Sequence, residues 1–159
     1  MENLGSLSIL LAFLLAAYAT LASWIGEWKK RPFLVASGER AVYAVWASLT
    51  LASGILVYAL MTNDFRLAYV AGHSNRDLPT LYKFAAWWGG QEGSLLFWSW
   101  ILASYSAVVV FQNRRKHRRI LPYVIAMLMG TMTFFTLLTT FIASPFEVLA
   151  GGRIIRAGF

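Results

Sequence analysis

Long apolar runs separated by short polar stretches dominate the sequence. Four of these runs have the length that an α-helix needs to cross the roughly 30 Å hydrocarbon core of a bilayer. None of the four contains Asp, Glu, Lys, Arg or His. The pattern therefore predicts an all-α integral membrane protein with four transmembrane helices, at residues 5–25, 41–62, 94–111 and 121–143.

The largest polar segment, residues 63–93, connects the second and third predicted helices. The sequence has no low-complexity linker, no detectable internal repeat and no room for a soluble domain. Residues 1–159 thus form a single polytopic membrane module. A structureless loop of about thirty residues is unusual in a compact protein, so we expect this loop to be ordered or functional.

The second half of the loop predicts a short helix. Asp77 can cap it, Pro79 suits its first position, and Gly89-Gly90 can end it. One face of this helix is apolar and consists of Leu81, Phe84, Ala85 and Trp88. We expect the helix to lie in the plane of the membrane interface, with its aromatic rings at the level of the lipid head groups.

Two charged side chains fit this local structure. Lys83 precedes Trp87 by four residues, so its ammonium group could lie over the indole ring. Glu92 stands at the start of the third span, where the helix dipole favours a carboxylate.

The composition supports a membrane protein. Only 13% of the residues are charged, against about a quarter in soluble domains. Aromatic residues make up 16%, and Trp and Tyr collect at membrane interfaces.

The basic residues are distributed unevenly between the two ends of the predicted helices. Nine lie on one side: Lys29, Lys30, Arg31, Arg40, Arg114, Arg115, Lys116, Arg118 and Arg119. Five lie on the other: Arg66, Arg76, Lys83, Arg153 and Arg156. By the positive-inside rule we expect the richer side in the cytoplasm, and both termini with the loop 63–93 outside.

The run "NRRKHRR", residues 113–119, could also attract nucleic acid or anionic lipid. We favour a topology anchor, because a short connection between two spans leaves no domain to present the run to a nucleic acid. His117 then belongs to this solvated cluster.

The sequence restricts the possible chemistry. Because the spans lack ionisable residues, a self-contained pump or ion-coupled transporter is disfavoured. The absence of cysteine excludes disulfides, thiolate metal sites and thioether attachment of haem to this chain. The spans offer no histidine as an axial haem ligand, and His73, in a polar loop, is more simply solvated. We find no catalytic constellation and no metal site.

The stretch "WWGGQEG", residues 87–93, joins the predicted loop helix to the third span. Glycines that stop one helix, Glu92 that starts the next and tryptophans at the interface explain most of it. One glycine would be enough for that turn. Three within five residues expose backbone that another flat group could approach closely.

The segment "YVAGHSNRDLPTLYKFAAWWGGQEGSLLFW" resembles the CcmF-type subunit of cytochrome c haem lyase, in the N-terminal region of that family. The matching positions are Tyr69, Val70, Ala71, Ser74, Asn75, Leu78, Pro79, Tyr82, Lys83, Ala85, Trp88, Gly89, Glu92, Gly93, Ser94, Leu95, Leu96 and Trp98. The run "SPFE", residues 144–147, resembles the motif that follows the fourth span of that family.

The resemblance implies a role in cytochrome c-type biogenesis at a bacterial inner membrane. Such lyases transfer haem from a membrane haem chaperone to apocytochrome c, which a thiol-handling partner prepares, on the outer, periplasmic face. The implied haem- or partner-facing surface consists of Lys83, Trp87, Trp88, Gly89, Gly90, Gln91, Glu92 and Gly93. Lys83 would be available for a haem propionate.

Members of the family are several times longer, and the histidines that ligate their haems would come after the position where this sequence stops. We therefore expect the axial ligands outside this chain, and activity only together with the remaining C-terminal part or a sister subunit of the lyase. The alternative is a membrane scaffold module that never contacts haem.

Overall fold

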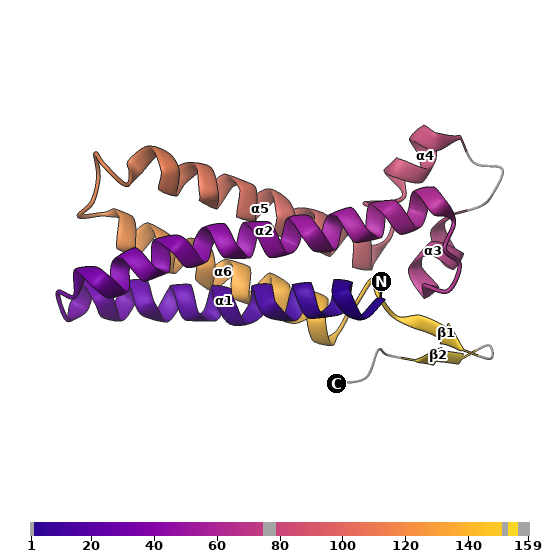
Figure 1. The fold of residues 1–159 in the computed structure, drawn as a ribbon, viewed down its shortest axis with the longest axis horizontal. Coiled ribbons are helices and arrows are strands. Elements are labelled where there is room, and N and C mark those ends of the chain that lie inside the picture. The colour runs from indigo at the N-terminus through magenta and orange to yellow at the C-terminus, as the bar shows by residue number, and fades with distance from the viewer. Residues whose placement is uncertain (1, 75–78, 151–152, 156–159) are drawn as a thin grey trace.

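The computed structural model describes residues 2–74, 79–150 and 153–155 (Figure 1). Within these residues, four helices are long and apolar enough to cross a membrane. They are α1 (Glu2–Trp28), α2 (Pro32–Thr62), α5 (Gln91–Asn113) and α6 (Leu121–Phe141). The four long apolar helices predicted from the sequence are confirmed as candidate membrane spans.

The four long helices form an elongated antiparallel bundle (Figure 1). Helix α1 packs on α2 and α6, and α5 packs on the same two helices, so the contacts run around a closed ring. The beginning of α1, the loop between α2 and α5, and the chain after α6 lie at one end of the bundle (Figure 1). We call this the loop end and the opposite end, with the two short turns, the basic end.

Small residues allow α1 and α2 to approach closely. Ala12, Ala16 and Ala19 recur at helical spacing along α1 and are fully buried. A Cβ atom on Gly38 of α2 would overlap Ser23 Oγ of α1. Packing of small residues is a common means of joining helices in a membrane, where the hydrophobic effect gives little drive.

Several buried hydroxyl groups bind within their own helices, although those of Ser6, Ser23 and Ser53 do not. Ser99 donates to Leu95 O at 2.8 Å, and Thr136 donates to Met132 O at the same distance. Because each hydroxyl uses a carbonyl one turn earlier, it can be buried without an unsatisfied donor. These side chains are therefore compatible with an apolar surrounding.

The helix that contains the second predicted span begins well before residue 41. Helix α2 begins at Pro32, a residue whose fixed φ suits the first position of a helix. Its first turns carry Glu39 and Arg40, which the sequence pattern assigned to a loop. The helix thus continues beyond its apolar run, as α1 and α5 also do by a few residues.

The loop 63–93 contains two short helices, α3 (Ala68–His73) and α4 (Thr80–Ala85). Helix α4 was predicted, although it ends earlier than expected, and Pro79 stands directly before it. The predicted cap at Asp77 lies outside the described residues. Helix α3 was not predicted, and the placement of α4 in the membrane interface stays a prediction.

The chain after α6 adds a pair of short strands to the predicted helical fold. Strands β1 (Val148–Ala150) and β2 (Arg153–Ile155) form a two-stranded antiparallel sheet, with Val148 opposite Ile155. Just before it, the buried ring of Phe146 lies against Gly5 of α1. The amide of Ala68 also donates to Glu147 O at 2.8 Å. The chain after the last span is therefore anchored to both α1 and α3.

The two basic clusters meet at the basic end. The charge of Arg119 acts on Lys30, and the rings of Trp24 and Tyr123 are 6.4 Å apart. The grouping of the two clusters at one end agrees with the charge pattern. Their cytoplasmic location stays a prediction.

Candidate functional site

Tyr69 of α3 joins the parts of the loop end. Its hydroxyl donates a 2.7 Å hydrogen bond to Ala86 O and accepts a 3.1 Å bond from the amide of Gly90. Its ring stacks on His73, with 4.4 Å between ring centroids, and His73 Nδ1 is 3.1 Å from Tyr69 O. Tyr69 is buried, and this burial raises the pKa of its phenol above the usual value of about 10. It is thus a neutral donor at physiological pH.

The turn between α4 and α5 is a succession of tight backbone hydrogen bonds. The amides of Trp87, Trp88 and Gly89 each donate to the carbonyl three residues earlier. Gly90 is extended and directly precedes α5, whose first turn contains Glu92. The glutamate in the first turn of the next helix is confirmed. The predicted glycine stop is not, because α4 already ends at Ala85 and a turn separates it from Gly89-Gly90.

The glycines of this turn have different surroundings. A Cβ atom on Gly93 would overlap Trp87 O and the Tyr69 hydroxyl. A Cβ atom on Gly90 would overlap the His73 ring. At Gly89 the nearest atoms are at ordinary van der Waals distances of 3.5 Å or more. Two of the three glycines therefore serve close internal packing and are not open to an external group.

Trp87 is the centre of an aromatic cluster that joins the turn to α5. Its buried ring lies 4.9 Å from Phe97 and 5.7 Å from Trp100, measured between centroids. Trp88 lies 5.6 Å from Phe84 and 5.5 Å from Phe97. The two tryptophans of the cluster differ in exposure. Trp87 is buried, whereas Trp88 is 44% exposed.

The exposed rings of the cluster form one aromatic surface, consisting of Phe84, Trp88 and Trp98. Leu81, which is 76% exposed, continues it along α4. The apolar face predicted for α4 therefore points outward. The face that carries Lys83 and Trp87 is the one that packs against the bundle.

Lys83 is only 8% exposed and already takes part in an interaction within the chain. Lys83 and Trp87 share the buried face of the segment, as their spacing predicted. The stacking of the ammonium group over the indole stays a prediction. Of the eight residues predicted to form a surface, the turn brings all together, but Lys83, Trp87 and Gly93 are buried.

Sequence reasoning missed Tyr69 as a member of the site. It was among the positions that match the family pattern, which was the available signal. Its partners, Ala86 and Gly90, are far away in sequence, so residue spacing did not reveal the contact.

Two tryptophans tie α5 to α2 further along the bundle. Trp100 Nε1 donates to Thr50 Oγ1 at 3.1 Å, and Trp46 Nε1 donates to Ser104 Oγ at 3.1 Å. Each indole thus has an acceptor on the neighbouring helix. Trp100 also contacts Trp87, which connects the site to the helix interface.

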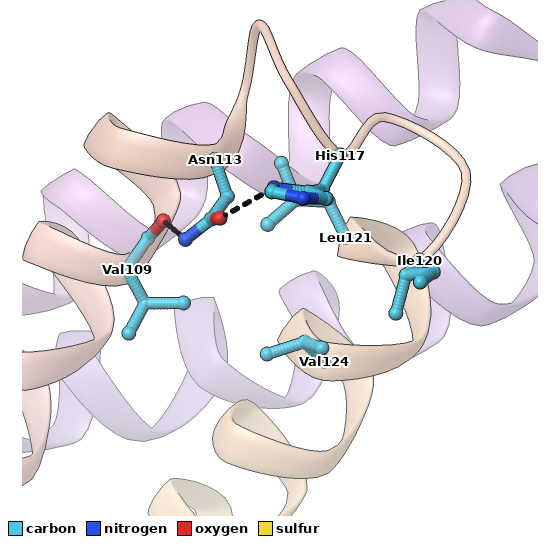
Figure 2. Close-up of a pocket in the computed structure, with 6 residues that line it drawn as sticks. All are labelled: Val109, Asn113, His117, Ile120, Leu121 and Val124. Carbon is cyan, nitrogen blue, oxygen red and sulfur yellow. Dashed lines mark hydrogen bonds between the residues drawn. The ribbon is translucent and has the colours of Figure 1, made fainter.

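The second histidine, His117, lies at the other end of the molecule. It lines a cleft of about 260 Å³ together with Val109, Asn113, Ile120, Leu121 and Val124. Figure 2 shows these six residues, which come from the end of α5, the following turn and the start of α6. His117 Nδ1 is 2.9 Å from Asn113 Oδ1, and Asn113 Nδ2 donates to Val109 O at 2.9 Å (Figure 2). His117 is exposed within the basic cluster, as predicted, and takes no part in the site at the loop end.

The fold and sequence match known proteins over most of the chain, although no family model matches. The chain is 37% identical over 158 residues to the cytochrome c-type biogenesis protein NrfE of Haemophilus influenzae, covering 99% of this chain and 24% of that protein. It is 36% identical over 147 residues to the cytochrome c-type biogenesis protein CcmF of Pseudomonas aeruginosa, covering 92% of this chain and 22% of that protein.

A solved structure, named cytochrome c heme lyase CcmF, superposes with a TM-score of 0.85 and 26% identity. The match covers 94% of this chain and 25% of that one, so the chain spans about a quarter of the length of these relatives. Because both sequence and fold agree over nearly all of its residues, the chain belongs to the CcmF/NrfE family of cytochrome c-type biogenesis proteins.

Proposed function

We propose that this chain is one membrane segment of a haem lyase that transfers haem from a membrane haem chaperone to apocytochrome c. The observation that carries the proposal is the match to CcmF in fold, with a TM-score of 0.85, over 94% of the chain. The four apolar helices and the relatives support a multi-pass protein of the bacterial inner membrane. In this proposal the loop end faces the periplasm.

The part of the loop end proposed to meet haem or a partner is the aromatic surface, together with the exposed backbone at Gly89 and the side chain of Gln91. Trp88 is held by Phe84 and Phe97, so its ring is preorganised for contact with a flat apolar group. Aromatic rings favour offset stacking or edge contacts, each worth about 0.5–1.5 kcal/mol beyond buried area. Haem is the cargo of the reaction here, and the surface would orient it or its carrier.

The described residues fit contact with the face of a porphyrin better than coordination of its iron. His73 Nε2 lies against Gly90, and the ring is stacked on Tyr69. We therefore place the axial ligands in the remaining part of the lyase, or in a sister subunit. The chain alone would not complete the transfer.

Lys83 has a different proposed role from the one the sequence suggested. Because it is buried under α4, a haem propionate could reach it only if α4 moved. Its present position favours holding α4 and the aromatic surface in place. Glu92 is half-buried in the first turn of α5 and supports the beginning of this helix.

A scaffold module is the second candidate. The observation that favours it is the internal use of Trp87, Gly90 and Gly93, which pack against Tyr69, His73 and the start of α5. In that case the turn would only shape the loop end for the neighbouring subunits, such as the thiol-handling partner of apocytochrome c.

Co-expression with the rest of the lyase would test the proposed surface. We expect Trp88→Ala and Gly89→Leu to reduce cytochrome c maturation, while Phe33→Ala leaves it unchanged. Phe33 is a matched control because it is an aromatic residue, 77% exposed, near the basic end. Equal maturation in all variants would contradict a functional surface at Trp88.

The second experiment separates haem contact from scaffolding. The chain is purified with and without its partners, and the Soret band is recorded. A band in the assembled complex that shifts with Trp88→Ala supports contact with haem. A band that does not respond to Trp88→Ala, or no band at all, favours the scaffold.

A further inference from the structure

An aromatic cleft lies at the basic end, far from the proposed haem surface. Trp24 and Trp28 of α1 and Tyr123 of α6 line a cleft of about 330 Å³. The three rings are 59%, 77% and 52% exposed. Because aromatic side chains favour the region where hydrocarbon meets lipid head groups, the cleft has the character of a membrane interface site.

The mouth of the cleft carries positive charge. Tyr123 and Arg119 both lie within electrostatic reach of the Lys30 ammonium group. Among the described acidic residues, Glu27 is the one whose charge acts on Lys30, through an ion pair with a 2.5 Å contact. Lys29 and Arg31 flank Lys30 in sequence, so the turn after α1 carries three consecutive cations.

The backbone holds Lys30 in an unusual conformation. Its φ angle is 52°, in the left-handed region that favours glycine. The amides of Lys30 and Arg31 donate to Glu27 O and Gly26 O, the two hydrogen bonds of a Schellman motif that ends α1. Glycine is the common residue at this position. A lysine here is strained, and it places a positive charge at the mouth of the cleft.

We propose that this cleft binds an anionic phospholipid of the bilayer, with the acyl chains against the three rings and the phosphate between Lys30 and Arg119. Basic residues at the end of a membrane helix attract anionic lipid, and a cleft between spanning helices adds a place for the chains. The proposal is independent of the haem-handling role, because its residues lie at the other end of the bundle.

Anionic phospholipid fits this site better than the other polyanions that a basic run can attract. The three rings give an apolar wall next to the charges, which suits a molecule with a charged head and hydrocarbon tails. A nucleic acid would use the cations and leave the cleft without a role. A competing RNA oligonucleotide is therefore part of the test.

The test uses the full 159-residue chain, purified in detergent and exchanged into phosphatidylglycerol and phosphatidylcholine with matched acyl chains. Native mass spectrometry then measures how many molecules of each lipid remain bound. For the unmodified chain we expect phosphatidylglycerol to be preferred at least about tenfold, from two cations near the phosphate.

Two charge variants localise the site. Lys30→Gln with Arg119→Gln should abolish the preference. Arg115→Gln with Lys116→Gln removes the same charge from the same end and should keep it, because neither side chain lines the cleft and neither is among the charges that act on Lys30. Equal loss in both double variants would show diffuse attraction and overturn the proposal.

Lys30→Gly tests lipid binding independently, in a variant whose fold should not be weakened. Glycine adopts the left-handed conformation without strain, so this variant should unfold at a temperature equal to or above that of the unmodified chain. It should nevertheless bind less phosphatidylglycerol. Unchanged lipid binding in this variant, or displacement of the lipid by the RNA oligonucleotide at equal charge, would refute the proposal.

Discussion

The hydroxyl of Tyr69 accepts a 3.1 Å hydrogen bond from the backbone amide of Gly90, a residue 21 positions later in the sequence. The same hydroxyl donates to Ala86 O at 2.7 Å. One phenol therefore satisfies an acceptor at the end of α4 and a donor just before α5. Through Tyr69, helix α3 supports the turn that carries Trp88. The aromatic surface therefore depends on Tyr69, which is not itself part of that surface.

Tyr69→Phe should destabilise the loop end. The substitution removes the acceptor of the Gly90 amide and leaves the Ala86 carbonyl with the Gly89 amide alone. A buried unsatisfied group costs about 1–3 kcal/mol. We expect faster hydrogen exchange at Gly90 and at the following amides of the turn. Tyr58→Phe, on an exposed face of α2, should change stability by less than about 0.5 kcal/mol. Equal exchange at Gly90 in both variants would disprove the bracing role.

Gly93→Ala and Gly89→Ala form a matched pair. At Gly93 the added methyl group would overlap Trp87 O and the Tyr69 hydroxyl, whereas at Gly89 it meets ordinary contacts. We expect Gly93→Ala to lower the free energy of unfolding by about 1–3 kcal/mol, as overpacking does. Gly89→Ala should be close to neutral. Thermal unfolding in detergent measures both, and a neutral Gly93→Ala would contradict the packing described here.

The stability of the loop end should fall at alkaline pH. Burial raises the pKa of the Tyr69 phenol in the folded state, which therefore holds its proton more tightly than the unfolded state. The resulting stabilisation is complete below about pH 10 and is lost as the pH rises through the folded-state pKa. In Tyr69→Phe this part of the alkaline loss should disappear. Unfolding curves at increasing pH, recorded for both chains, check the difference.

The indole of Trp100 and the hydroxyl of Thr50 should be coupled energetically. Their 3.1 Å hydrogen bond joins α5 to α2 within the spanning region. A double-mutant cycle with Trp100→Phe and Thr50→Val should give a coupling of about 0.6 kcal/mol, the average for such bonds in membrane proteins. Replacing Thr50→Val by Thr131→Val on α6 provides a control cycle, for which the coupling should be close to zero. Equal coupling in the two cycles would argue against the bond.

The spans could be predicted from the sequence because each is a long apolar run without ionisable residues. The start of α2 could not, because Glu39 and Arg40 look like loop residues although they lie on a helix that begins at Pro32. Hydropathy identifies the part of a helix that is apolar and gives no information on turns that continue past it. The strands after Phe146 were missed for a related reason, since three-residue strands carry little periodic signal.

For the site, local patterns were sufficient for the turn and insufficient for its surroundings. The first-turn glutamate and the shared face of Lys83 and Trp87 depend on neighbours within four residues. The end of α4 at Ala85, ahead of the glycines, was not predicted. Which face of α4 is buried depends on its packing against α2, and the role of Tyr69 depends on contacts far along the sequence. The i, i+4 spacing of Lys83 and Trp87 was compatible with either face.

The contact between Gly5 and Phe146 orders events during synthesis. Gly5 enters the membrane with the first helix, yet the ring that covers it emerges only after the fourth. The hydrogen bond from the amide of Ala68 to the carbonyl of Glu147 likewise cannot form before Glu147 has been synthesised. The contacts of α1 and α3 with the chain after α6 can therefore form only once all four helices have been synthesised.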